Sequence, residues 1–224
     1  MELRHALLPT LAGPMLAVAG PGGLRHLRIL AEADTWPLVL TELVAGLVRG
    51  TVAVAAAPGT GTDAGTDTGT AAETAAAPAA DLAANPAAAA DGPNLTEDPA
   101  HFKPLLRQLG EYFTGERRQF ELDLAPRGTA FQQRVWSSLR GIPYGEYRTY
   151  SHLAVALGEP RAARAVGQAA AQNPLPILIP CHRLLGSRGH LVGFAGGTDL
   201  KARLLRLEGH TLAAGSRVRP PRLF

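Results

Sequence analysis

Two short apolar runs separated by a glycine-rich turn lie near the start of the chain. Residues 15–19 form the first run, and in the second, residues 24–30, apolar positions partly alternate with Arg and His. The glycines of residues 20–23 favour a turn between two strands. Residues 36–47 then place apolar side chains at helical spacing. We therefore expect a small N-terminal sheet with a helix against it.

The first residues also superficially resemble a secretory signal. Pro9, Gly13 and Pro14 interrupt the apolar stretch, and Glu2 places an acid where a signal peptide carries basic residues. No apolar run approaches the length of a transmembrane helix. The chain has one cysteine, so an internal disulfide framework is excluded, which favours a reducing compartment. We expect a soluble cytoplasmic protein without membrane contact.

A low-complexity insert of Ala, Gly, Thr, Pro and Asp occupies about residues 52–92. It contains no aromatic residue, so we expect it to be mostly disordered and assign it no chemistry. Between Arg49 and Lys103 there are seven acidic residues and no basic ones. The rest of the chain therefore holds 22 basic against 12 acidic residues, although the total net charge is only +3. Such a basic body indicates a polyanionic partner, although ordinary solubility charge would look the same.

Regular patterns resume at about Pro99. Apolar residues between positions 102 and 113 recur at helical spacing, and Gly115 ends that helix. Residues 120–124 alternate between apolar and polar side chains and predict an edge strand. The turn at residues 126–128 is a plausible boundary, which divides the chain into domains 1–125 and 126–212 and a basic tail, 213–224.

Three helices with local start and stop signals follow this boundary. Thr129 is a candidate N-cap for the first helix, and Thr149 is a candidate for the second, at residues 150–157. A break at residues 158–160 leads into the third, at residues 161–172. The last two predict a helix-turn-helix. The third is mostly Ala and Gly, so it could approach a groove closely, with Arg161 and Arg164 on one face. A tightly packed core helix would have the same composition.

The single cysteine ends an apolar run. Residues 177–179, between Pro176 and Pro180, predict a buried strand or extended segment that presents Cys181 at its end. The thiolate is the reactive form of cysteine, and the adjacent His182 could take up the proton directly or through a water. Neighbouring residues on an extended strand point to opposite faces, so a direct contact does not follow. A buried structural cysteine beside a surface histidine is the alternative.

The run from Phe131 to Gly209 resembles the O6-alkylguanine-DNA alkyltransferases, a family of direct-reversal DNA repair proteins. The resemblance rests on motif blocks in chain order, which are residues 142–146, 149–150, 161–167, 173–174, 179–183, 193–197 and 204–209. The N-terminal part resembles the family only in general pattern, and the insert does not match. The implied fold is α/β (α+β), with a small N-terminal sheet-plus-helix domain before a mostly helical domain that contains the helix-turn-helix.

The resemblance implies catalytic roles for five residues. Cys181 would accept the alkyl group, His182 would generate its thiolate through a water, and Glu208 would orient His182. Tyr150 would lie beside the flipped base and donate a proton as the alkyl group leaves. Asn173 would tie the recognition helix to the cysteine loop. Apart from the motifs, Glu208 would be taken for a solvated helix-end carboxylate and Tyr150 for a core residue.

The resemblance also implies a DNA interface and a pocket. Arg164 would be the finger that fills the space of the extruded base, although a phosphate contact would suit it equally. The expected DNA-binding residues are Arg164, Tyr150, Arg161, Ala163 and Gly167, and the expected pocket residues are Phe194, Ala195, Gly196 and Pro180. Phe194 stands where many relatives have Tyr. Glycines in this loop would permit close backbone approach.

The implied function is repair of O6-alkylguanine, with irreversible transfer of the alkyl group to Cys181. The nucleotide would be flipped out of double-stranded DNA. Each monomer would act once, without a cofactor, and the chain has no Cys-based zinc site, because its one cysteine is the acceptor. A non-catalytic helix-turn-helix sensor of alkylated bases is the alternative, and Cys181 argues against it. A Cys/His thiol hydrolase is a third interpretation, which the helix-turn-helix does not favour.

Overall fold

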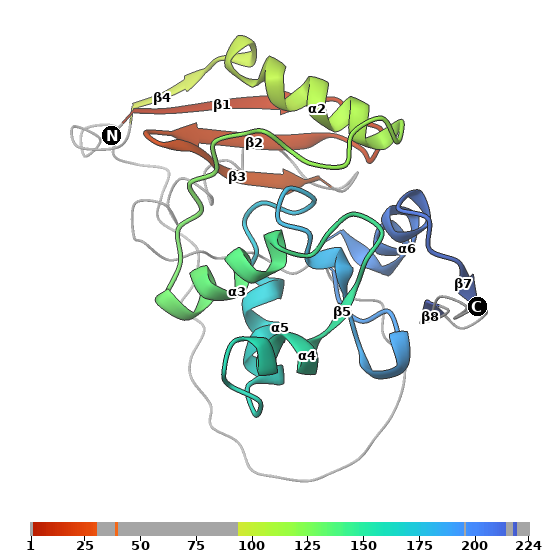
Figure 1. Cartoon of the computed structure of the whole chain (residues 1–224). Coiled ribbons are helices and arrows are strands. Elements are labelled where there is room, and N and C mark those ends of the chain that lie inside the picture. Colours follow the sequence, from red (N-terminus) through yellow and green to blue (C-terminus); the bar gives the residue numbers. More distant parts are fainter. Residues whose placement is uncertain (1, 31–38, 40–93, 195, 214–216, 219–224) are drawn as a thin grey trace, which may run out of the picture.

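The computed structural model describes residues 2–30, 39, 94–194, 196–213 and 217–218. Its N-terminal part is a four-stranded sheet in the order β3-β2-β1-β4 (Figure 1). The strands are β1 (Glu2–Leu8), β2 (Met15–Gly20), β3 (Gly23–Ile29) and β4 (Asn94–Glu97). The β1–β2 and β2–β3 pairs are antiparallel, and β1 pairs with β4 in parallel. The predicted helix at 36–47 and the insert at about 52–92 lie outside the described residues, except for the buried Val39.

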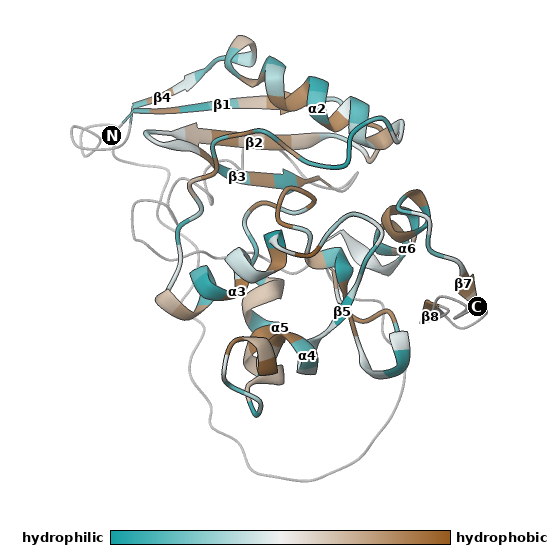
Figure 2. Cartoon of the chain, viewed as in Figure 1, coloured by the Kyte–Doolittle hydropathy of each residue, from teal (hydrophilic) through white to brown (hydrophobic). Residues whose placement is uncertain are grey.

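The strands predicted at residues 15–19 and 24–30 are confirmed as β2 and β3. Five of the six residues of β2 are buried, and Figure 2 shows this central strand as apolar along most of its length. The turn between the strands needs glycine, because Gly23 has φ +121° and an added Cβ would lie 2.2 Å from the Asp123 carbonyl oxygen. The flanking strands β1 and β4 were not predicted from the pattern.

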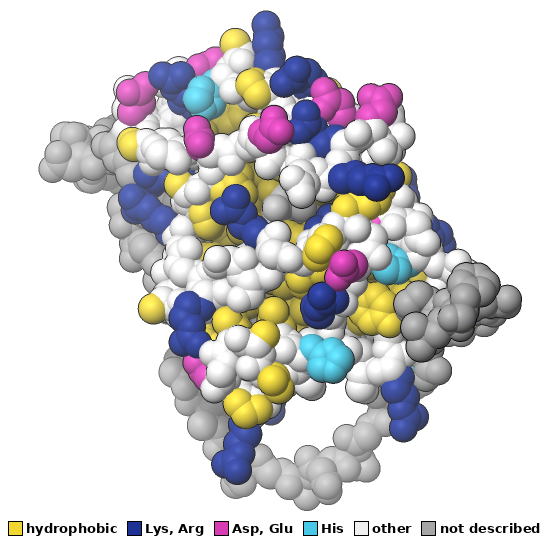
Figure 3. All heavy atoms as spheres, viewed as in Figure 1, with side chains coloured by type: hydrophobic (Ala, Val, Ile, Leu, Met, Phe, Trp, Pro, Cys, Tyr) yellow, Lys and Arg dark blue, Asp and Glu magenta, His cyan; other side chains and the backbone are white. Residues whose placement is uncertain are grey.

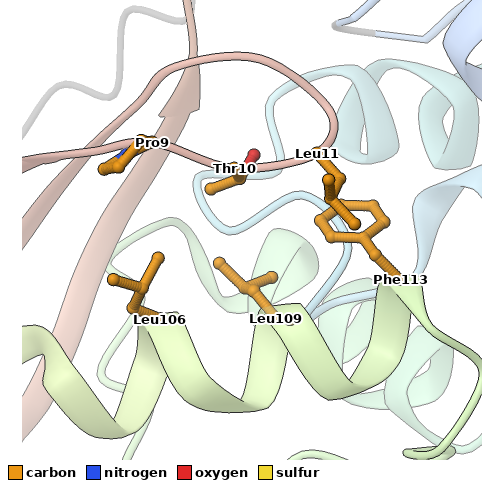
Figure 4. Close-up of a pocket in the computed structure, with 7 residues that line it drawn as sticks. Pro9, Thr10, Leu11, Leu106, Leu109 and Phe113 are labelled. Atoms are coloured by element: carbon orange, nitrogen blue, oxygen red, sulfur yellow. The ribbon is translucent and has the colours of Figure 1, made fainter.

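Helix α2 (Lys103–Phe113) packs along the sheet after a short 3-10 turn, η2 (Pro99–Phe102). Its buried residues are Leu105, Gln108, Leu109 and Tyr112. Thr114 is its C-cap, and Gly115 follows in the left-handed region, at φ +81°, so the helix ends where the sequence predicts. Side chains of α2 face the β1–β2 turn across a groove of about 310 Å³ (Figure 4). None of the residues that line this groove is among the predicted site residues.

The edge strand predicted at residues 120–124 is wrong. Only Leu124 bridges to the sheet, at Leu24. The Gln108 side chain instead bonds to both backbone groups of Glu121: its Nε2 donates to the Glu121 carbonyl over 3.0 Å, and its Oε1 accepts from the Glu121 N–H over 2.8 Å. A side-chain amide thus satisfies the groups that a neighbouring strand would otherwise pair. The alternating pattern therefore marks a segment that covers the β3 edge without forming a strand.

The C-terminal part is built around short helices and two-residue strands. The helices are α3 (Ala130–Arg140), α4 (Tyr150–Ala156), α5 (Ala163–Ala171) and α6 (Gly197–Leu207), with 3-10 turns η3 (Cys181–Arg183) and η4 (Ser187–Gly189). Strand β5 (Arg148–Thr149) pairs in parallel with β6 (Leu184–Leu185), and β7 (Leu212–Ala213) pairs with β8 (Arg217–Val218). This small sheet followed by helices confirms the predicted fold class.

Both predicted threonine caps are confirmed. Thr129 and Gln132 form a reciprocal capping box at the start of α3, and the Thr149 hydroxyl accepts from the His152 N–H at the start of α4. Helix α5 begins later than predicted, with Ala162 as its N-cap. Arg161 therefore lies before the helix, so the prediction that Arg161 and Arg164 share a helical face is wrong. Pro160 and the Glu159 carbonyl, which accepts from the Ala162 N–H, form the turn instead.

Backbone hydrogen bonds join the sheet to the helical part. The edge of β3 bonds to residues 123–125 through Leu24, and the Leu27 N–H donates to the Pro174 carbonyl over 2.8 Å. One apolar core runs through the sheet, α2, α3, α4, α5 and the segment before Cys181. The Trp136 indole donates to the Ala169 carbonyl over 2.8 Å and fixes α3 against α5. The sheet therefore directly supports the segment that carries the cysteine.

Candidate active site

The segment before Cys181 is a tight loop, so the predicted strand at residues 177–179 is wrong, although its burial is confirmed. Ile177 has φ +75°, which is a strained conformation for a β-branched residue. The Ile179 N–H donates to the Leu175 carbonyl over 2.8 Å and closes the loop. Pro180, at φ −79° and ψ 64°, then forms an inverse γ-turn, in which the Cys181 N–H donates to the Ile179 carbonyl. This geometry turns the chain so that Cys181 begins η3.

Asn173 links the end of α5 to the cysteine. Its Nδ2 donates to the Ile179 carbonyl over 2.8 Å and to Sγ of Cys181 over 3.1 Å, while its Oδ1 accepts from the Leu175 N–H. Burial raises the pKa of the Cys181 thiol, and the bond from Asn173 and the charge of Lys201 oppose that rise. The thiol therefore lies in a site that keeps it protonated until a base acts on it.

Glu208 is the centre of a buried polar cluster. Its Oε1 lies 3.0 Å from Nε2 of His182 and accepts from the Tyr112 hydroxyl over 2.8 Å. Arg183 donates from Nη2 to Oε1 over 2.8 Å and from Nε to Oε2 over 2.9 Å. Burial alone would raise the pKa of Glu208, but the bonds from His182 and Arg183 outweigh it and hold the pKa at about 2. Glu208 is therefore a carboxylate at neutral pH.

His182 is fully buried beside the cysteine. Burial lowers its pKa, against the opposing effect of Glu208, so its imidazole is neutral at pH 7. A carboxylate at Nε2 requires that this nitrogen carry the proton. The Nδ1 atom is then an acceptor, and it has no hydrogen-bond partner among the described residues. The imidazole thus has the tautomer of a general base.

Tyr150 opens α4 and lies against α5. An added Cβ on Gly167 would lie 3.7 Å from the Tyr150 ring, which places the bare surface of α5 beside this ring. Burial, and secondarily the charge of Cys181, raises the pKa of Tyr150 to about 12. Tyr150 is therefore a protonated phenol close enough to Cys181 to respond to its charge. Ala163 is the first residue of α5, one position before Arg164.

The loop before α6 approaches His182 from another side. The Phe194 ring meets the His182 ring edge-on, with centroids 6.2 Å apart. An added Cβ on Gly196 would lie 2.7 Å from the end of the Leu200 side chain, which would have to shift to make room for it. Ala195 lies outside the described residues. The buried Lys201 fixes this loop, because its Nζ donates to the carbonyls of Leu184 and Val192, each over 2.6 Å.

Pro180 lines a separate cavity of about 590 Å³, together with Arg118, Tyr144 and Arg183. Cys181, Tyr150 and Phe194 do not line it. Pro180 therefore precedes Cys181 in the sequence, but it lines a cavity that Cys181 does not border.

Arg161 and Arg164 are both exposed, and neither pairs with a carboxylate in the part of the chain that the structure describes. Nearby, Arg134 pairs with Glu159 over 2.9 Å and Arg148 with Glu146 over 3.0 Å. On the face shown in Figure 3, acidic side chains gather mainly over the sheet and α2, at the top. The helix-turn-helix thus offers two unpaired guanidinium groups.

Sequence reasoning missed three residues of this site. The sequence shows Arg183 only as part of a motif block, Tyr112 as one apolar position of a helix, and Lys201 without any role. Each is buried and bonded to a group far away in the sequence. A charged residue inside an apolar helix pattern, as at Lys201, was the available signal. No described helix could cross a membrane, and the described residues contain no metal-binding group of three or more His, Cys, Asp or Glu.

Known proteins are similar to this chain over about half of its length. A family model described as "6-O-methylguanine DNA methyltransferase, DNA binding domain" matches residues 130–210. A methylated-DNA–protein-cysteine methyltransferase of Methanosarcina barkeri is 53% identical over 116 residues, which are 52% of this chain and 73% of that protein. The constitutive enzyme of Bacillus subtilis is 51% identical over 117 residues, which are 52% of this chain and 67% of that protein. The chain belongs to the methylated-DNA–protein-cysteine methyltransferase family.

Solved structures agree over nearly the whole chain. The Mycobacterium tuberculosis O6-methylguanine methyltransferase has a TM-score of 0.62 at 30% identity, covering 99% of this chain and 97% of that one. The Mycobacterium tuberculosis protein OGT in complex with DNA has a TM-score of 0.61 at 32% identity, covering 92% and 93%. The family predicted from the motif blocks is confirmed, and the likeness extends to the N-terminal part that lacks those motifs.

Proposed function

We propose that this protein repairs DNA by moving an alkyl group from O6 of guanine to Sγ of its own Cys181. The observation that carries the proposal is the buried series Cys181, His182 and Glu208, in which Nδ1 of a neutral imidazole has no hydrogen-bond partner among the described residues. This is the arrangement of a nucleophile with a base and a group that orients the base. The family relation supports the same reaction.

The residues have separate roles in the proposed reaction. Nδ1 of His182 takes the Cys181 proton through a water, and the thiolate attacks the alkyl carbon. The S–C bond forms as the C–O6 bond breaks, and the leaving guanine takes a proton from Tyr150, whose raised pKa keeps that proton available. The product is a thioether. It offers no leaving group for water to displace, so each molecule acts once.

DNA is the partner that this reaction requires, and its alkylated guanine must be flipped into the site. The small residues Ala163 and Gly167 let α5 approach a groove closely, and Arg164 supports the duplex where the base has left. Arg161, in the turn before α5, contacts a phosphate. Phe194 and the backbone at Gly196 border the base, and Asn173 holds the thiol in place. Binding of this kind is independent of base sequence.

We also propose that the protein acts as a cytoplasmic monomer. Cys181 must stay reduced to react, which a reducing compartment secures. One copy of the chain supplies all groups that the proposed reaction uses. A non-catalytic sensor would have no use for a cysteine bonded to Asn173 and placed beside a base.

The test is incubation with a duplex that carries O6-methylguanine, labelled in the methyl group. We expect at most one label per protein, recovered on the peptide that contains Cys181. Cys181→Ser should bind the duplex with unchanged affinity and take up no label, because an alcohol is far less acidic than a thiol. Label on another residue, or repeated turnover, would refute the proposal.

A further inference from the structure

One hydroxyl from the N-terminal part of the chain reaches the carboxylate of the relay. Tyr112 lies at the end of α2, and its side chain is 0% exposed. Its hydroxyl donates to Oε1 of Glu208 over 2.8 Å, across 96 positions of sequence. Oε1 is also the oxygen that lies 3.0 Å from Nε2 of His182. Tyr112 and His182 therefore share a single carboxylate oxygen.

The Tyr112 ring alone does not explain the choice of tyrosine. The ring packs on Phe120 and Tyr144, with centroids 5.4 Å and 6.1 Å away, and a phenylalanine would make the same contacts. A buried hydroxyl is costly unless it is bonded. Burial, followed by the charge of Glu208, strongly raises the pKa of Tyr112, so the phenol stays protonated and can serve the carboxylate only as a donor.

We propose that Tyr112 is a positioning residue for alkyl transfer, whose hydroxyl fixes Oε1 of Glu208 toward His182. This inference rests on the proposed function. Among the described contacts of Glu208, the other side-chain donors, His182 and Arg183, come from the short turn η3. Tyr112 is the donor that comes from the N-terminal part. Docking of the sheet and α2 therefore completes the relay, which gives the N-terminal part a chemical role.

Removal of the Tyr112 hydroxyl should change the pKa of His182 in a known direction. With one donor fewer, the carboxylate attracts the proton on the imidazole more strongly, so the pKa of His182 rises. More of the imidazole is then protonated at a given pH, and less of the free base remains to take the Cys181 proton. Among the described residues, the other charged or titratable groups that act on Glu208 or His182 are Arg183, Lys201, Tyr144 and His210. They are unchanged in a Tyr112→Phe protein.

The experiment compares single-turnover transfer by the wild type and Tyr112→Phe over a range of pH. The substrate is a saturating duplex with labelled O6-methylguanine, and DNA affinity is measured separately. Tyr112→Phe should bind DNA as the wild type does and transfer about tenfold more slowly at pH 7, where the imidazole stays neutral, because Glu208 no longer holds that imidazole in the orientation that transfer needs. The pH of half-maximal rate should rise by about half a unit. A nuclear magnetic resonance titration of the His182 ring should show the same upward shift.

Tyr144→Phe is the matched control. It removes the same atom from the same aromatic cluster, but the Tyr144 hydroxyl donates to the Leu207 carbonyl and not to a carboxylate. It should leave the pH profile unchanged. If the wild type labels Cys181 and Tyr112→Phe matches it in rate and profile, the positioning role is refuted. The role is also refuted if both variants slow transfer equally without a shift in pH. A wild type that labels nothing would overturn the proposed function itself.

Discussion

Replacement of Glu208 by Gln should destabilise the folded protein by about 3 to 5 kcal/mol at pH 7. The change keeps the side-chain volume but removes the charge that partners Arg183, which is itself buried. The bonds from His182 and Arg183 lower the pKa of Glu208 from 4.5 to about 2. At 1.36 kcal/mol per pKa unit, this shift corresponds to about 3 kcal/mol. The remainder comes from the loss of bonds that a neutral amide cannot replace.

The pH dependence follows from the direction of the shift. The carboxylate is more acidic in the folded chain, so its contribution is complete above its unfolded pKa and is lost as the pH falls toward 2. The difference in unfolding free energy between wild type and Glu208→Gln should therefore be constant from pH 7 to about pH 5.5. It should shrink by about 1 kcal/mol by pH 4. Glu208 raises the pKa of His182 in the wild type, so Glu208→Gln lowers that pKa further, and the added acid lability of His182 offsets part of this shrinkage. His26, whose pKa burial lowers to about 4, adds the same amount to both proteins.

The assay is urea unfolding at a series of pH values, followed by circular dichroism. Glu159→Gln is the matched control, because Glu159 pairs with Arg134 at the surface, with 42% of its side chain exposed. That change should cost less than about 1 kcal/mol. A cost below about 1 kcal/mol for Glu208→Gln at pH 7 would refute the assignment of Glu208 as a buried ionised centre.

Two further variants test the DNA interface and the hairpin. Arg164→Ala should slow transfer from a duplex at least tenfold more than transfer from free O6-methylguanine, because in the proposed reaction this side chain supports the flipped state and does not touch the alkyl group. Equal slowing of both rates would contradict this role. Gly23→Ala should lower the unfolding free energy by more than about 2 kcal/mol in urea titration, because its Cβ would meet the Asp123 carbonyl at 2.2 Å. Gly158→Ala is the control, because Gly158 also has a positive φ, of +78°, but has open space around it, and this change should cost about 1 kcal/mol.

Features with local causes could be predicted from the sequence. The caps at Thr129 and Thr149 depend on residues three positions apart, and both are present in the structure. Strands β2 and β3 are neighbours along the chain and are joined by a glycine turn. The short polar strand β4 is different, because it pairs with β1 across about 90 positions. No local pattern records such a pairing.

In the site, too, features with local causes could be predicted and features set by distant contacts could not. The motif blocks indicated Cys181, His182 and Glu208, because those residues are adjacent or lie in a recognisable block. The apolar run at residues 177–179 suggested a strand, but the loop is held by Asn173 and by the left-handed Ile177. A sequence pattern reports burial and does not report strain imposed by tertiary contacts. For the same reason Tyr112 looked like a core residue, since its ring has the apolar spacing of α2 and its hydroxyl meets Glu208 only in the folded chain.

In the proposed reaction, burial shifts the pKa of the base, His182, and the pKa values of the two proton donors, Cys181 and Tyr150, in opposite directions. It raises the pKa of Cys181 and of Tyr150, so both hold their protons at neutral pH. It lowers the pKa of His182, so the imidazole is free to accept one. A protein that reacts once loses its function if the thiol is spent on another electrophile or oxidant, and a thiol reacts with these far more slowly than a thiolate. A buried thiol with a neutral base therefore protects Cys181 until a flipped guanine enters the site.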